Sequence, residues 1–191
     1  MRRIAVALVL TGFCLPCAAE EAFSLPALMQ GLAEVPAAEA RFTEVRRMQM
    51  LRVPLEVQGT LRYVRPDRLE RHVQSPYEET ILIEGNRVSV DNPARGEHRS
   101  YALASLPAAY AMVESLRATL AGDLAALERH YYLKLTGGRE AWTLSLTPRD
   151  PGVADMLAEV RLQGSAARIM RIEFNEAAGD RTIMTIREVK P

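Results

Sequence analysis

The clearest pattern in this chain is the alternation of apolar and polar residues between positions 55 and 63. The apolar residues share one parity, namely Leu55, Val57, Leu61 and Tyr63, and the residues at 56, 58, 60 and 62 are polar. Successive side chains of a strand point to opposite faces of a sheet, so this pattern predicts a strand with one apolar and one solvated face. We expect the apolar face to lie beneath the helix predicted below over 105–122.

Further strands are expected on both sides of this one. Gly85-Asn86 is typical of a hairpin turn, and Gly137-Gly138 marks a second one. Trp142, Leu144 and Leu146 alternate with polar residues, as Leu55 and its partners do. The expected strands cover 40–51, 55–64, 68–74, 78–84, 87–91, 131–136, 142–147, 168–175 and 181–189. The segment 155–160 fits either a helical turn or a strand.

Two helices are expected at proline-containing starts. Ser24 stands before Leu25-Pro26 as an N-cap, and Leu28, Met29, Leu32 and Val35 follow at helical spacing. Ser105-Leu106-Pro107 starts the second helix and Gly122 ends it. Its apolar stripe consists of Tyr110, Val113, Leu116 and Leu120. A short helix capped by Asp123 follows. Strands, then helices, then strands predict a single α+β domain with an antiparallel meander sheet.

The first 19 residues have the pattern of a cleaved secretory signal peptide. Arg2 and Arg3 precede an apolar run of roughly 14 residues, which is shorter than the about 20 that a membrane-spanning helix needs. We expect cleavage after Ala19 and a mature domain over 20–191. A membrane anchor is one alternative. A lipid-modified cysteine at Cys14 or Cys17 is another, although neither is preceded by the small residue that such sites require.

Composition and motif content argue against several classes of function. Both cysteines lie inside the leader, so the mature domain has no disulfide and no zinc-thiolate site. Without the two leader arginines, 22 basic and 24 acidic residues remain, and this balance does not attract nucleic acid. The three histidines lack metal-ligand spacing, and there is no G-x-S-x-G, G-x-G-x-x-G or Walker motif. We therefore expect no enzyme activity, no cofactor and no metal.

Several short motifs follow one another along the chain, namely Phe42-Thr43-Glu44, Gly59-Thr60-Leu61, Arg65-Pro66, Glu84-Gly85, the run from Trp142 to Arg149, and the closing pair at 171–174 and 182–186. Their order resembles that of the periplasmic outer-membrane lipoprotein carrier proteins, the LolA-like family. This resemblance implies a curved antiparallel sheet that forms an incomplete, half-open β-barrel covered by helices. The chain departs from the family at Leu69-Glu70-Arg71-His72 and at Val88-Ser89-Val90, where aromatic residues are usual. Aromatic residues make up 6% of the chain, so an aliphatic, methionine-rich lining is expected, with Met48, Met50, Met112 and Met170 as candidates.

The resemblance also implies a function. It is that of a periplasmic carrier or chaperone that shields the acyl chains of lipoproteins or related acylated lipids and transfers them towards the outer membrane. Such a carrier works as a monomer without cofactor or nucleic acid, and its partners are an inner-membrane exporter and an outer-membrane receptor. A ligand-sensing or interaction module of envelope regulation on the same fold is the alternative.

The expected lining of the hydrophobic cavity combines residues from the predicted strands and the second helix. Its members are Phe42, Met48, Met50, Leu55, Val57, Leu61, Tyr63, Tyr110, Val113, Leu116, Trp142, Leu144 and Leu146. Ordinary core packing is the alternative for Met48 and Met50. Arg65 matches the family arginine that holds the helical lid against the sheet, and a solvated arginine at a strand end is the alternative there.

Overall fold

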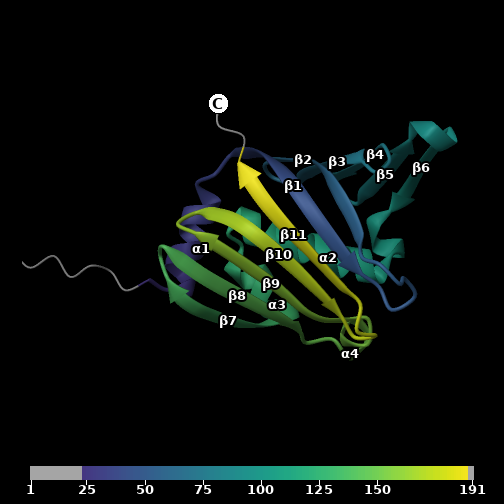
Figure 1. Ribbon diagram of the computed structural model, residues 1–191. Helices are drawn as coiled ribbons and strands as arrows, with labels where there is room; N and C mark the ends of the chain where they lie inside the picture. Colours follow the sequence, from purple (N-terminus) through teal and green to yellow (C-terminus); the bar gives the residue numbers. More distant parts are fainter. Residues whose placement is uncertain (1–22, 189–191) are drawn as a thin grey trace, which may run out of the picture.

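The strands of the computed structural model, which describes residues 23–188, form one open antiparallel sheet (Figure 1). Their order across the sheet is β6-β5-β4-β3-β2-β1-β11-β10-β9-β8-β7. The strands are β1 (Ala37–Arg47), β2 (Leu55–Val64), β3 (Arg68–Ser75), β4 (Glu79–Glu84), β5 (Arg87–Asn92), β6 (Glu97–Ala102), β7 (Tyr131–Gly138), β8 (Ala141–Pro148), β9 (Leu157–Ser165), β10 (Arg168–Glu176) and β11 (Arg181–Glu188). The predicted α+β class with a curved, unclosed antiparallel sheet is confirmed.

Helices cover one face of this sheet. They are α1 (Leu25–Ala33), α2 (Pro107–Ala121), α3 (Leu124–His130) and the short α4 (Pro151–Ala154), with 3₁₀ turns η1 (Pro93–Arg95) and η2 (Leu103–Ser105). In Figure 1 the sheet curls around α1, α2 and α3, which lie behind its front strands. The N-terminal and C-terminal halves of the sheet meet where β1 pairs with β11. The face towards the helices is called the concave face below.

The register predicted for residues 55–63 is confirmed. Val57 and Tyr63 are buried on the concave face, with Leu55 and Leu61 half-buried beside them. Glu56, Gln58 and Arg62 are exposed on the opposite face. Period-2 alternation therefore placed this strand correctly, because a shift of one residue would have exposed the whole apolar set.

The helix caps agree with the sequence at three of four positions. Ser24 accepts a hydrogen bond from the Ala27 amide and caps α1, and Asp123 caps α3 in the same way. Gly122 ends α2 with φ 69°, and a side chain at this position would overlap the Met29 carbonyl of α1. A glycine is therefore needed both for the left-handed backbone and for the close approach of α1 and α2. Ser105 is the exception, since its hydroxyl donates to the Ala102 carbonyl instead of capping α2.

The apolar stripe predicted for α2 is only partly confirmed. The buried face consists of Ala111, Ser115 and Thr119, with Leu116 packed beside them, whereas Tyr110 is 41% exposed. Small residues spaced by four bring the helix close to its neighbours, and the Ser115 and Thr119 hydroxyls donate to carbonyls of the preceding turn. Hydropathy alone does not predict that a serine or threonine is buried when its hydroxyl donates a hydrogen bond to a carbonyl of its own helix.

Other boundaries also differ from expectation. β1 ends at Arg47 instead of residue 51, so residues 48–54 form a loop. β6 was not predicted, because its residues are mostly polar and exposed along this sheet edge. The ambiguous segment 155–160 resolves largely into β9, which begins at Leu157. The expected leader, its cleavage site, Cys14 and Cys17 lie outside the described residues.

Candidate lipid-binding face

One half of the concave face is tightly packed. Side chains from β8, β9 and β10 meet α1 and α3 there, and among them Trp142, Leu144 and Leu146 are buried as the sequence predicted for an inward-facing strand. The Trp142 ring lies against Gly164, and its Nε1 donates to the Ala166 carbonyl at 2.9 Å. Burial this complete means that a ligand could reach these side chains only if the helices moved.

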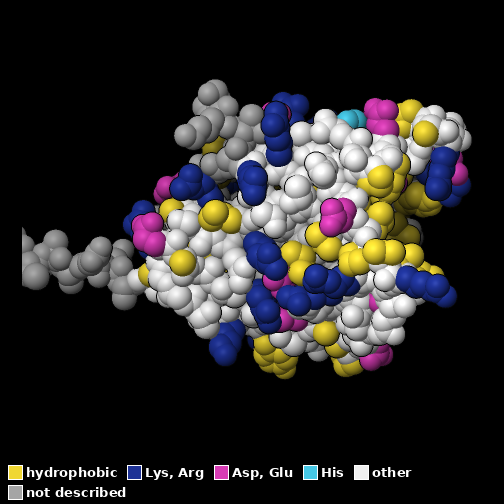
Figure 2. All heavy atoms as spheres, viewed as in Figure 1, with side chains coloured by type: hydrophobic (Ala, Val, Ile, Leu, Met, Phe, Trp, Pro, Cys, Tyr) yellow, Lys and Arg dark blue, Asp and Glu magenta, His cyan; other side chains and the backbone are white. Residues whose placement is uncertain are grey.

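The other half of the concave face, under β3 to β6, is less well covered. Leu69, Ile81, Ile83 and Val90 are half-buried there. The register aligns Tyr63, Leu69, Ile83, Val88 and Tyr101 in one row across β2 to β6. We call Leu69, Ile81, Ile83, Val90 and Tyr101 the apolar margin. In Figure 2 hydrophobic side chains gather on the right of the molecule, where Figure 1 places β4, β5 and β6.

The start of α2 adds exposed apolar surface next to this region. The helix follows β6 directly through η2, whose Leu103 amide donates to the Asn86 carbonyl between β4 and β5. Leu106 and Tyr110 at this end of α2 are exposed, and Val113 and Leu116 further along are half-buried. The combination of a half-buried sheet face and a neighbouring exposed helix end is suited to the reversible covering of an apolar chain.

The four methionines proposed from the sequence lie in different environments. Met50 is 80% exposed and Met48 half-buried, and both lie in the loop after β1. Their parity with Phe42 has no meaning beyond Arg47, where the strand ends. Met170 is exposed at an irregularity in β10, while Met112 of α2 packs against the core. The described part of the concave face is thus lined mainly by aliphatic and aromatic side chains.

Arg65 contacts a helix, although not the one that was expected to be the lid. Its Nη1 donates to the Ala33 carbonyl at the end of α1, and its amide donates to the Pro36 carbonyl at 3.0 Å. The side chain is also exposed, so both interpretations from the sequence describe part of its environment. Arg65 therefore fastens α1 to the end of β2.

Two residues that the sequence interpretation missed hold α2. Arg117 donates to the Gly85 carbonyl at 3.0 Å, and its guanidinium lies 3.6 Å from the Asp67 carboxylate. Tyr131 of β7 donates its hydroxyl to the Ala111 carbonyl at 2.7 Å. Burial raises the pKa of Tyr131 to about 12. The sequence could have indicated the role of Arg117, because it is an arginine within a largely apolar helix.

Four charged side chains on the concave face were also missed. Glu44, Arg46, Arg71 and Glu79 lie there and contact one another. The signal was the parity of Glu44, which it shares with the buried Phe42 in β1. Tyr63, on the same face, has a buried hydroxyl without a hydrogen-bond partner, and burial raises its pKa. The concave face therefore combines apolar surface with a few polar groups.

The convex face is polar. In Figure 2 basic and acidic side chains gather at its centre. Glu173 of β10 is a buried carboxylate that forms ion pairs with Arg161, Arg171 and Arg181. Burial would raise the pKa of Glu173, but hydrogen bonds from Arg181 and Arg171 outweigh that effect, so its pKa is lowered. The carboxylate is 2.7 Å from Arg171 Nε. These ion pairs link β10 to β11 across the outer surface.

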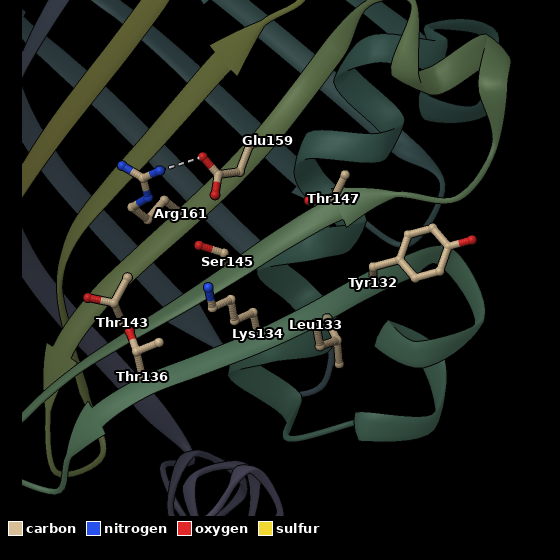
Figure 3. Close-up of a pocket in the computed structure, with 9 residues that line it drawn as sticks. All are labelled: Tyr132, Leu133, Lys134, Thr136, Thr143, Ser145, Thr147, Glu159 and Arg161. Carbon is tan, nitrogen blue, oxygen red and sulfur yellow. Dashed lines mark hydrogen bonds and ion pairs between the residues drawn. The ribbon is translucent and has the colours of Figure 1, made fainter.

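A shallow hollow on this face is shown in Figure 3. It measures about 380 Å³ and is lined by Tyr132, Leu133, Lys134, Thr136, Thr143, Ser145, Thr147, Glu159 and Arg161. Arg161 and Glu159 form an ion pair at 2.7 Å within it. Such a mostly polar lining offers little apolar surface to an acyl chain, so the concave face is the better candidate site.

Among residues 23–188, no three histidine, cysteine or acidic side chains are grouped as metal ligands would be. None of the helices within that range is both long and apolar enough to cross a membrane.

Comparisons with known proteins agree on one kind of relative. A family model described as "Outer membrane lipoprotein carrier protein LolA-like" matches residues 17–186. A curated outer-membrane lipoprotein carrier protein from Hahella chejuensis is 24% identical over 165 residues, which cover 84% of this chain and 75% of the relative.

Solved structures resemble the chain more distantly. A LolA superfamily protein from Nitrosomonas europaea has a TM-score of 0.47 at 11% identity and covers 87% of this chain and 92% of its own. A chain from the complex of Pseudomonas aeruginosa MucA and MucB has a TM-score of 0.47 at 15% identity. It covers 86% of this chain and 56% of its own.

Proposed function

Because the chain belongs to the LolA-like family of outer membrane lipoprotein carrier proteins, we propose that it is a periplasmic carrier for acylated cargo. In this proposal the concave face shields the acyl chains of a lipoprotein or a related lipid from water and releases them towards the outer membrane. The leader over residues 1–19 directs export, and the domain over 20–191 acts as a monomer without a catalytic step.

The observation that carries the proposal is the uneven packing of the concave face. Under β8 to β10 the side chains form a solid core, whereas the apolar margin under β3 to β6 is half-buried, with Tyr101 exposed, beside an exposed helix end. The tightly packed half can keep the domain folded while cargo replaces the helix that covers the apolar margin. We propose that cargo contacts the apolar margin together with Leu55 and Leu61, and that α2 moves to admit it.

The magnitudes fit a carrier that must also let go of its cargo. Shielding about 15 methylene groups from water is worth roughly 12 kcal/mol, at ~0.8 kcal/mol for each. The transfer of the same chain from an apolar protein face to a membrane is nearly neutral, because both environments are apolar. The direction of transfer is then decided by the difference in stability between the covered and uncovered states of the protein. An inner-membrane exporter and an outer-membrane receptor would supply that difference.

The proposal is tested by native mass spectrometry of protein purified from the periplasm of its own cells. We expect a fraction of the molecules to carry a lipid or an acylated peptide that organic solvent removes. The same spectra give the mass of the polypeptide. The proposal requires the mass of a chain that has been cleaved after Ala19. Protein that never carries lipid, but co-purifies with an envelope protein, would contradict the carrier function and support an interaction module. A diacylglycerol on a cysteine would anchor the protein to a membrane and would contradict the proposal of a carrier that leaves the membrane with its cargo.

A further inference from the structure

A cluster of charged side chains interrupts the apolar concave face. We call Glu44, Arg46, Arg71 and Glu79 the concave ionic cluster. Glu44 lies opposite Val57 on one side and Met184 on the other, and both of these neighbours belong to the hydrophobic core. Arg71 lies opposite Leu61 and Ile81. The cluster thus lies between the tightly packed half of the concave face and the apolar margin.

The contacts within the cluster are specific. Nη2 of Arg71 lies 3.2 and 3.1 Å from the two carboxylate oxygens of Glu44, and Nε of Arg46 donates to the same carboxylate. The Arg71 guanidinium also lies over the Phe42 ring, 5.0 Å from its centroid. Glu44 is 2% and the Arg71 side chain 15% exposed. Arg71 is therefore held in a defined orientation on this face.

One donor of the cluster remains unsatisfied. Nη1 of Arg71 is buried and has no hydrogen-bond partner. It forms a longer ion pair with the Glu79 carboxylate, at 3.7 Å, and Glu79 is more exposed than Glu44. Buried charge pairs are costly to desolvate and rarely stabilise a fold more than apolar residues would. A buried guanidinium nitrogen without a hydrogen-bond acceptor calls for an explanation, and a ligand that supplies an acceptor oxygen would satisfy it.

We propose that the concave ionic cluster binds the acidic head group of an amphiphilic cargo. This inference rests on the proposed function and specifies the cargo as a lipid with a carboxylate or phosphate group. A guanidinium recognises both groups through charge-assisted hydrogen bonds. The acidic group bonds to Nη1 of Arg71 and displaces Glu79, while Glu44 and Phe42 keep the guanidinium in place.

The hydrocarbon chain then lies across the apolar margin. Ile81 and Val90 follow Arg71 in the same row of the sheet, on β4 and β5. Neighbouring strands are about 4.8 Å apart, so the distance from β3 to β6 is roughly 14 Å, about the length of a twelve-carbon chain. A head group at Arg71 would thus place a chain of this length on the half-buried surface.

The test compares three amphiphiles with the same chain, namely dodecanoate, dodecyl phosphate and dodecanol, by titration calorimetry at pH 7.5 and below their micelle concentrations. We expect the wild-type protein to bind at least one acid about tenfold more tightly than dodecanol, since only an acid can form a charge-assisted hydrogen bond with the guanidinium. Arg71→Met should reduce this preference to less than twofold and leave dodecanol binding unchanged. Arg62→Met, on the opposite face of β2, is the matched control and should keep the preference.

A second variant tests the proposal without removing the guanidinium. Glu79→Gln takes away the competing carboxylate, so we expect the favoured acid to bind roughly threefold more tightly. Preference for dodecanoate would assign a carboxylate cargo, and preference for dodecyl phosphate a phosphate cargo. Equal wild-type affinity for all three amphiphiles would overturn the inference and leave the carrier function standing. Binding of none of them would overturn both.

Discussion

The neighbours Val57 and Gln58 differ completely in environment, although they are adjacent on β2. Val57 is fully buried on the concave face, and Gln58 is exposed on the convex one. We expect Val57→Arg to destabilise the domain by about 3–5 kcal/mol or to prevent folding, because it buries a charge without a partner. Gln58→Arg should change the free energy of unfolding by less than about 0.5 kcal/mol. Urea unfolding measures both, and equal tolerance at the two positions would contradict the register.

The Tyr63 hydroxyl gives a second prediction at this scale. It is buried without a hydrogen-bond partner, and a donor or acceptor left in this state costs about 1–3 kcal/mol. Tyr63→Phe removes the unsatisfied group and keeps the ring. We therefore expect the variant to be as stable as the wild type or up to about 1 kcal/mol more stable in thermal unfolding. A loss of stability would mean that the hydroxyl has a partner.

Single residues were predictable from the sequence where a regular period applied to them. The alternation placed Leu55, Val57 and Tyr63 correctly, because a covered strand repeats every two residues. It failed for Met50, since the strand had already ended at Arg47. It was not applied to Glu44, whose charge suggested solvent although its parity placed it beside Phe42. A charged residue on an apolar face can be predicted from the sequence only if the alternation of the strand, and not the residue type, decides its face.

At the scale of elements, the attachment of α2 to β7 depends on the Tyr131 hydroxyl. Its folded-state pKa is about 12, above the ordinary value of about 10, so the neutral form is favoured by folding. The neutral Tyr131 hydroxyl makes its full contribution to the free energy of unfolding below about pH 10, and this contribution is lost as the pH rises towards 12. We expect the wild type to lose on the order of 1–3 kcal/mol more than Tyr131→Phe between pH 9.5 and 11.5.

Chemical unfolding at a series of pH values makes this comparison. At neutral pH, Tyr131→Phe should cost about 1 kcal/mol, because the bond to the Ala111 carbonyl is lost. Parallel curves for the two proteins over the alkaline range would show that the hydroxyl does not titrate with unfolding.

Elements were predicted well where they carry an apolar face and a turn signal. β2 was placed at its observed bounds, and α1 begins at the capping serine. β6 was missed because a polar edge strand owes its pairing to β5 and not to buried side chains. The buried face of α2 was missed because Ser115 and Thr119 pack as small residues. The half-open barrel itself came from the resemblance to a family, since periodicity does not specify how far a sheet curls.

At the scale of the whole molecule, stability in acid should depend on Glu173. The arginines of β10 and β11 lower the pKa of Glu173 in the folded state. The carboxylate therefore stabilises the fold at pH values above its pKa in the unfolded chain, about 4.5, and this stabilisation is lost as the pH falls below that value. We expect Glu173→Gln to be less stable than the wild type at pH 7. The difference should shrink as the pH falls from 5 towards 2, as followed by circular dichroism. A constant difference would contradict this assignment.

Transfer of cargo depends on how easily α2 leaves a sheet that stays folded. Arg117 attaches this helix to the Gly85 carbonyl and to Asp67, each two residues from a member of the apolar margin, Ile83 and Leu69 respectively. Losing these contacts costs about 1–1.5 kcal/mol, which is up to a tenfold change in the population of the open state. Arg117→Ala should therefore release a bound fluorescent acyl probe to lipid vesicles roughly five- to tenfold faster, and amide exchange should accelerate in α2 but not in β2. Arg62→Ala, exposed on the convex face, should release the probe at the wild-type rate. If Arg117→Ala accelerates exchange in α2 without changing the release rate, then α2 does not control the exit of cargo, and the covering that moves must be sought elsewhere.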